Sequence, residues 1–425
     1  MCVGLPAKVM TMKDGMAVVD ASGAKREVSA ELIENLEPGD YVMVHAGIAI
    51  AKITEEDEDE AEDLLEQKTA AYVTMKEQLK KAKAIIEGYD GPAVRVMEVC
   101  GTHTHEIFHL GVRKILPPQV ELISGPGCPV CVTPAGFIDE AVWLALEKNV
   151  TICTFGDLVR VPGSTKSLAD ARSLGGKIQM VYSPMDAFEY AKEHKDEQVV
   201  FLSVGFETTT PASCLSVKMA KEAGLTNYAL LTANKTMPGA YEMLKDSADV
   251  FLYPGHVNAI TGNALNRKLC EEEGISGIVT GFTASEILTA FAVLLKKFPE
   301  GNPFFVNAYP RVVTEEGSIP AQKLIKEWME PCDSQWRGLG MIKNSGLRLR
   351  KEAQDFDARV KFSIPKMEGR TSPACRCGDV LQGKCRPTDC KVFGKGCTPL
   401  HPIGACMVSN EGACSAYYQY NSRGE

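Results

Sequence analysis

Two cysteines in the segment SGPGCPVC, residues 124–131, have the spacing of a redox or metal-binding pair. Cys128 and Cys131 stand in a C-x2-C arrangement on a turn that glycines loosen and prolines stiffen. The turn follows a strand-like run at 120–123 and precedes a helical pattern at 135–146. A helix N-terminus stabilises a nearby thiolate, so either cysteine is predicted to be reactive. The alternative is a tight turn whose cysteines only pack in the core.

A second group of reactive side chains follows other strand-like runs. Cys100 begins the segment CGTHTH, in which His103 and His105 are candidate bases for a cysteine nucleophile. The same thiol equally suits a soft metal ion. Glu207, in the turn GFETTT, is a candidate to move a proton or to orient a histidine, and helix capping is its alternative role. For His103, His105 and His256, the alternative is a hydrogen-bonded structural histidine.

The last segment, residues 371–425, contains seven cysteines among glycines and prolines and has few long apolar runs. Such a segment cannot easily fold on an apolar core, and a metal centre would supply the missing stabilisation. The paired C-x2-C knuckles of zinc ribbons are absent from it, whereas wide and irregular thiol spacing favours a 4Fe-4S cluster. The seven are Cys375, Cys377, Cys385, Cys390, Cys397, Cys406 and Cys414.

The elements that position the first two groups repeat one pattern, an apolar strand, a Gly-rich turn and an amphipathic helix. This alternation predicts parallel sheets with helices on both faces, divided into two α/β subdomains within residues 91–370. The candidate residues directly follow strands, at the edge where open α/β sheets bind ligands. No glycine pattern for a dinucleotide or for ATP phosphates is present. Nine strands are predicted, at 94–99, 120–123, 150–154, 177–182, 199–204, 228–231, 250–253, 277–279 and 303–306.

The N-terminal part differs from this pattern. Residues 1–53 alternate in short strand-like runs, which predict a small OB-like β-barrel with a thiol, Cys2, at its very start. Residues 54–90 predict an acidic linker followed by a surface helix over 67–86. The predicted barrel strands are 7–10, 16–19, 25–28 and 41–45.

Only one element is clear in the stretch between the α/β pattern and the cysteine-rich tail. Residues 311–370 are turn-rich, and we expect them to be mixed and helical. The clearest helix in this stretch is predicted at 321–329.

Composition narrows the class of protein further. The chain has 425 residues, of which 45% are hydrophobic and 24% charged, as in an ordinary globular protein. A net charge of −9 argues against a general nucleic-acid or anionic-membrane surface. No apolar run is long enough to span a membrane and no signal peptide is evident, so we expect a cytoplasmic protein. In that compartment, 15 cysteines indicate metal or redox chemistry more than structural disulfides.

Taken together, the motifs resemble two hydrogenase maturation families. The start MCVGLPAKV, the segment GDYVMVHAG at 39–47 and the acidic stretch after it resemble HypC. From about residue 74 the chain resembles HypD, so the sequence predicts a fusion of two proteins that are usually separate. The HypD-like motifs are CGTHTH (100–105), GPGCPVC (125–131), GFETTTP (205–211), PGHVNAITG (254–262) and CTPLHPIGACMVSNEGACSAYY (397–418).

The resemblance implies a redox-active scaffold that assembles the Fe(CN)2CO group of NiFe-hydrogenases. Iron would be held between Cys2, which becomes the first residue when the family's initiator methionine is removed, and Cys100, with His103 nearby. Cys128 and Cys131 would be a redox pair that exchanges electrons with a 4Fe-4S cluster in the tail. Expected partners are HypE, which donates cyanide and is supplied by HypF, and the hydrogenase large-subunit precursor.

By the family's C-x14-C-x6-C-x16-C pattern, the cluster ligands correspond to Cys375, Cys390, Cys397 and Cys414. Cys377, two residues from Cys375, is an alternative ligand. Two other classes of function also stay open. One is a thiol-dependent redox enzyme that uses Cys100 and a histidine, and the other is an iron-sulfur adaptor without a second iron site.

Overall fold

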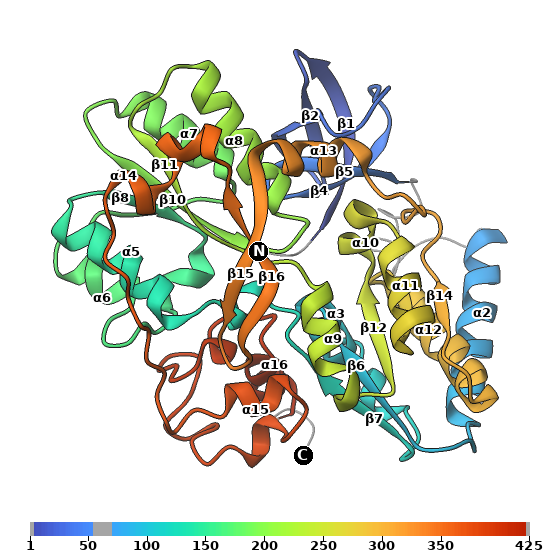
Figure 1. The fold of residues 1–425 in the computed structure, drawn as a ribbon. Helices are drawn as coiled ribbons and strands as arrows, with labels where there is room; N and C mark the ends of the chain where they lie inside the picture. The colour runs from blue at the N-terminus through green and yellow to red at the C-terminus, as the bar shows by residue number, and fades with distance from the viewer. Residues whose placement is uncertain (1–3, 54–69, 422–425) are drawn as a thin grey trace.

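The N-terminal part is a closed five-stranded barrel (Figure 1). The computed structural model of the chain describes residues 4–53 and 70–421. The four predicted barrel strands are confirmed, and a fifth, β5, was missed. Its sequence, IAIAKI, lacks the polar alternation of a half-exposed strand because both of its faces are largely buried. The strands are β1 (Leu5–Lys13), β2 (Met16–Ala21), β3 (Ala24–Ser29), β4 (Tyr41–His45) and β5 (Ile48–Ile53), in the order β1-β2-β3-β5-β4.

Two parallel sheets form the α/β part, and all nine predicted strands are present in them. The chain builds one edge of the five-stranded sheet, crosses to build the whole four-stranded sheet, and then returns to complete the first. The five-stranded sheet has the order β14 (Phe305–Asn307), β13 (Ser276–Thr280), β12 (Val250–Pro254), β6 (Val94–Glu98) and β7 (Val120–Ser124). The four-stranded sheet has the order β11 (Tyr228–Asn234), β10 (Val199–Gly205), β8 (Thr151–Thr154) and β9 (Ile178–Met180).

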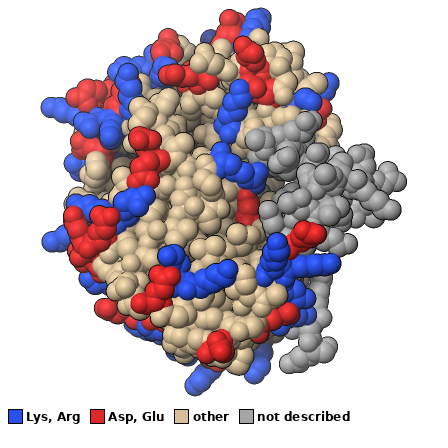
Figure 2. Space-filling view, turned by 90° about the vertical axis from the view of Figure 1, so that its right-hand side faces the viewer, with Lys and Arg blue, Asp and Glu red and all other residues tan. Residues whose placement is uncertain are grey.

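The helix predicted at 67–86 is α2 (Ala70–Glu87), which packs on α12 (Ala284–Lys297) beside the five-stranded sheet. The predicted acidic linker before it lies outside the described residues. No helix in the described part of the chain is long and apolar enough to cross a membrane. On the face of Figure 2, Lys and Arg alternate with Asp and Glu around an uncharged centre, so the described surface there offers no continuous basic patch.

The stretch expected to be mixed and helical is partly a β-hairpin. The helix predicted at 321–329 is confirmed as α13 (Ile319–Trp328), but β15 (Met329–Trp336) and β16 (Gly340–Leu349) follow it as an antiparallel pair. Proline, aspartate, asparagine and glycine in these strands weaken the local β preference. Tertiary contacts decide instead: Trp336 is fully buried and its indole donates to Ser345 Oγ at 2.8 Å.

The cysteine-rich tail folds back onto the α/β part. Its longest helix, α16 (Ala413–Asn421), packs on α3 (Gly101–His109), the helix that follows Cys100. A small apolar cluster of Phe108, Ala416 and Tyr417 joins the two helices. The tail therefore lies close to the first reactive segment, although about 300 residues separate them in sequence.

The barrel has two apolar surfaces. Its interior is a separate small core that contains Val9, Val19 and Val42. Its outer face joins the main core of the α/β part, and β5 packs on α10 (Gly255–Thr261). The residues of that face, the docking face, are Leu32, Tyr41, Met43, Ile48, Ile50 and Ile53.

Candidate functional site

Cys100 lies at the carboxyl end of β6, as N-cap of α3, with extended backbone angles. The backbone groups of His103 and Thr102 at the helix start favour its thiolate. Burial outweighs this effect and raises the pKa of Cys100 to about 12. At neutral pH the group is thus a thiol, unless a metal cation replaces its proton.

The loop that carries the C-x2-C pair packs directly against Cys100. The Gly101 amide donates to the Gly127 carbonyl at 3.0 Å. A Cβ atom at Gly127 would lie 2.1 Å from the Cys100 nitrogen, so only glycine permits this approach. Cys128, the next residue, is thereby held beside Cys100.

The structure corrects which helix follows the pair. The helix expected at 135–146 is α5 (Ala135–Glu147), but a four-residue helix, α4 (Pro129–Val132), stands between it and Cys128. Cys128 is the N-cap of this short helix, and Cys131 lies within it. Burial raises the pKa of both thiols, so the helix start does not make either of them a thiolate.

A series of thiol contacts leads from this pair to the tail. The Cys128 and Cys131 thiols interact with each other, and Cys131 also interacts with Cys406. Cys406, fully buried, in turn contacts Cys377 at the edge of the tail pocket. Four sulfur atoms therefore form a continuous path between the α/β part and the tail.

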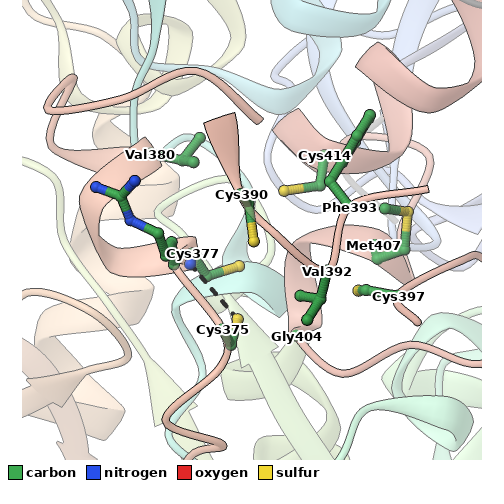
Figure 3. A pocket seen from close by; sticks show the side chains of 11 residues that line it. Cys375, Cys377, Val380, Cys390, Val392, Phe393, Cys397, Gly404, Met407 and Cys414 are labelled. Atoms are coloured by element: carbon green, nitrogen blue, oxygen red, sulfur yellow. Dashed lines mark hydrogen bonds between the residues drawn. The ribbon is translucent and has the colours of Figure 1, made fainter. Parts of the chain in front are cut away.

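The tail pocket brings together all four predicted cluster ligands and adds a fifth thiol, Cys377 (Figure 3). The space between these side chains is narrow and partly open to solvent. The sulfur atoms point toward its centre in Figure 3. The remaining tail cysteines, Cys385 and Cys406, do not line it. The other lining residues are Arg376, Val380, Val392, Phe393, Gly404 and Met407.

The donor set of this pocket has the chemistry that a cluster held by thiolates needs. Five thiols line the space, and apolar side chains such as Phe393 line much of the rest. The Ile403 amide donates to Cys397 Sγ at 3.3 Å, and a Cβ at Gly404 would lie 2.5 Å from Cys375 Sγ. These features allow the backbone to approach and stabilise the sulfurs.

Arg337 places a buried positive charge among the same thiols. It is only 7% exposed, and its guanidinium donates to the carbonyls of Thr133 and Pro162 at 2.7 and 2.9 Å. Burial lowers its pKa, while the thiols around it, with Cys377 first among them, act in the opposite direction. The charge would favour thiolates at both the pair and the pocket.

Histidines surround the junction between the barrel and the α/β part. His103 Nε2 contacts the Gly281 carbonyl at 2.8 Å, and the ring stacks on Phe282 with centroids 4.4 Å apart. Burial lowers the pKa of His103 to about 4, so the ring is neutral at pH 7. On the other side of Phe282 lies His256, with centroids 4.1 Å apart, and His45 of the barrel interacts electrostatically with His256.

His105 lies elsewhere. Its Nε2 contacts Tyr420 Oη of the tail at 3.3 Å, and its ring stacks on His109. The ring contacts of the two candidate bases go to other groups, since His103 Nε2 contacts the Gly281 carbonyl and His105 Nε2 contacts Tyr420. Activation by a cysteine–histidine pair is therefore disfavoured.

Glu207 is buried at the carboxyl end of β10. Its Oε1 accepts from the Met237 amide at 2.9 Å, and burial raises the pKa of Glu207 to about 7. Tyr241, also buried, interacts electrostatically with both Glu207 and Cys100. A carboxyl group that is partly protonated at neutral pH thus lies within electrostatic reach of the Cys100 region.

Sequence reasoning missed the roles of three residues: Cys406, Arg337 and His45. Cys406 and His45 lie inside motifs quoted above. Their roles were still missed, because each of the three acquires its role through contacts with residues far away in the chain. Cys2 lies outside the described residues, so its predicted approach to Cys100 stays a prediction.

The fold and site define a cysteine-rich α/β protein with two parallel sheets, a thiol-lined pocket and a docked barrel, and comparison with known proteins identifies its family. The HypD family model, described as "Hydrogenase formation hypA family", matches residues 74–421, and the HupF/HypC family model matches residues 1–65. The chain belongs to the HypD family and is a fusion with a HypC-type N-terminal domain. It is a hydrogenase maturation factor, and it works with other hydrogenase maturation proteins.

Individual relatives agree with the family models. The chain is 42% identical over 336 residues to hydrogenase maturation factor HypD of Rhodobacter capsulatus, covering 77% of this chain and 89% of the relative. It is 40% identical over 335 residues to HypD of Escherichia coli, covering 78% and 90%. It is 39% identical over 337 residues to HypD of Azotobacter vinelandii, covering 77% and 89%.

Proposed function

We propose that the protein assembles the Fe(CN)2CO unit of NiFe-hydrogenases at the junction between its barrel and its α/β part. The iron cargo would be bound by the thiolates of Cys100 and Cys2, one from each domain. The observation that carries the proposal is the path of sulfur contacts from the loop against Cys100 to the tail pocket. Thiolates suit low-spin iron with strong-field ligands, and the buried junction would exclude water.

The redox part of the proposal uses the buried pair. Oxidation of Cys128 and Cys131 to a disulfide releases two electrons and two protons. These electrons would reduce the cyanide donor carried by HypE, which HypF supplies. Cys375, Cys390, Cys397 and Cys414 would hold a 4Fe-4S cluster, which stores and returns single electrons when bound. Arg337 would offset the negative charge of the thiolates.

Glu207 is proposed as a proton carrier at the junction, and His103 as a neutral neighbour of the iron ligands. The hydrogenase large-subunit precursor would receive the completed unit. The surroundings of Cys100 favour a metal-binding role over the thiol-dependent enzyme. The adaptor alternative differs only in lacking a second iron site.

Infrared spectroscopy of the purified full-length protein tests the proposal. The wild type is expected to show cyanide and carbonyl stretching bands, and Cys100→Ala and Cys2→Ala are each expected to lose them while keeping the tail cluster. Cys270→Ala, a buried thiol on α11 (Ala264–Glu273), is the matched control and should keep the bands. Bands at full intensity in either ligand variant contradict the assignment of that ligand, and a wild type without bands but with a cluster supports the adaptor.

A further inference from the structure

The imidazole of His256 is buried with neither ring nitrogen hydrogen-bonded to any residue that the structure describes. Only 5% of the residue is exposed. Leaving a buried donor or acceptor without a partner destabilises a folded protein. An unsatisfied side chain inside a native fold therefore calls for an explanation, and a bound ligand is one.

His256 lies between the two segments that carry the proposed iron ligands. On one side, a Cβ at Gly4 would be 2.4 Å from its Cε1 and 2.9 Å from its Nε2, so this ring edge contacts the chain two residues after Cys2. On the other side, Phe282 contacts His256 at a tilt and stacks on His103, which follows Cys100 by three residues. The ring is thus fixed in position while its polar atoms have no described partner.

The charge state of the ring decides what it can bind. Burial lowers the pKa of His256 well below its usual value, and His45 and His103 act in the same direction. At neutral pH the ring is neutral, with one N–H donor and one lone pair. Such a donor suits an anionic acceptor that itself carries no proton.

We propose that His256 donates a hydrogen bond from its imidazole N–H to a cyanide nitrogen of the iron unit, and so orients the unit between its two thiolates. This inference rests on the proposed function. Bound cyanide has a lone pair on nitrogen that points away from the iron and accepts hydrogen bonds well. The oxygen of bound carbon monoxide is a much weaker acceptor, so a fixed donor would reserve this position for cyanide.

Infrared spectra of the full-length protein with its iron unit test the inference through band positions. Loss of a hydrogen bond to the cyanide nitrogen lowers the cyanide stretching frequency, so His256→Phe is expected to shift cyanide bands to lower wavenumber. His256→Gln keeps an N–H donor and should shift them less. His109→Gln, whose side chain is 60% exposed in the wild type, is the control and should leave every band in place.

Unchanged cyanide bands in His256→Phe would overturn the inference. A carbonyl band that moves to higher wavenumber also overturns it, because this indicates loss of an electron-donating ligand and hence an imidazole bound to iron. Loss of all bands in both His256 variants, with the tail cluster retained, overturns it as well, since Gln still offers a donor. If the wild type itself lacks the bands, the proposed function fails and this inference fails with it.

Discussion

The tail pocket and the barrel junction both present cysteine to a metal, but they are built in opposite ways. The pocket gathers five thiols from one short segment around a narrow, partly open space. The junction offers Cys100 as the proposed metal ligand in the described residues, among buried histidines, a carboxyl group and aromatic rings. The pocket can fill a complete ligand set from its own segment, whereas the junction depends on elements from different domains.

This difference in construction suits the tail pocket to a permanently bound metal group and the junction to a metal unit that is later released. In the proposal, four thiolates from one segment would bind a cluster whose loss would unfold that segment, so binding and folding would be linked. Two thiolates from separable domains can release their metal when one domain moves, without unfolding either. The polar side chains at the junction are needed to orient a transient ligand, and the tail pocket has few of them.

The largest effect is expected at the pocket. Cys397→Ala should abolish the visible absorption of a cluster and destabilise the tail, because the tail lacks an apolar core of its own. Iron and acid-labile sulfide analysis measures the loss. Cys385→Ala, in the same segment but away from the pocket, is the control and should keep full cluster content. Equal iron and sulfide content in both variants would contradict the claim that the pocket thiols hold a cluster.

The same assay decides between Cys375 and Cys377. Cys375→Ser is expected to lose the cluster. Cys377→Ser is expected to keep it, while breaking the contact with Cys406. The reverse pattern would show that the fourth ligand is Cys377 and that the spacing inferred from the family does not apply here.

The next effect concerns the pair that lies between the two regions. Cys128 and Cys131 are expected to form a reversible disulfide on mild oxidation, because their thiols already contact each other. Alkylation in denaturant followed by mass spectrometry should find both protected after oxidation and both modified after reduction. Cys153 and Cys214, which are buried single thiols, should be modified in both states. Full modification of the pair after oxidation argues against a redox link.

The fourth prediction tests how the buried carboxyl group of Glu207 makes the stability of the fold depend on pH. Because the pKa of Glu207 is raised from 4.5 to about 7 in the folded protein, the protonated form stabilises the fold. This contribution is fully present below about pH 4.5 and is lost as the pH rises to about 7, a change of about 3 kcal/mol. Glu207→Gln removes it, so the variant should gain stability relative to wild type across that window.

Urea unfolding midpoints at several pH values measure this difference. Glu242→Gln, which removes an exposed carboxyl group on α9 (Pro238–Leu244), should show no such trend. A constant difference between Glu207→Gln and wild type from pH 4.5 to 7 contradicts the burial argument.

The smallest effect is expected from Gly4→Val. A side chain here would overlap His256 and the sulfur of Met43, which is 2.6 Å from a Cβ. Overpacking of this kind costs about 1–3 kcal/mol, and the cost should fall on docking rather than on the barrel interior. Hydrogen exchange should increase on α10 and β5 but not on β2. Thr11→Val, at an exposed position of β1, is the control, and faster exchange throughout the barrel would assign the damage to folding instead.

The sequence predicts elements well where chemistry and structure are both local. Each of the nine α/β strands is an apolar run that ends at a turn, and the reactive residues follow these runs. The hairpin β15–β16 was missed because its residues are polar and its stability comes from Trp336. The contact between Cys131 and Cys406 could not be predicted from the sequence either, because 274 residues separate the two and no local pattern indicates the contact.

The two apolar surfaces of the barrel set a condition on how it can leave the junction. The docking face would meet water on departure, and exposing apolar area costs about 25 cal/mol per Å². The interior core would remain intact, so the departing barrel would stay folded with an uncovered face that includes Met43, Ile48 and Ile50. The barrel would therefore leave the α/β part readily only when another protein binds and covers the docking face. Under that condition the cargo passes between two bound proteins and is not released into solution.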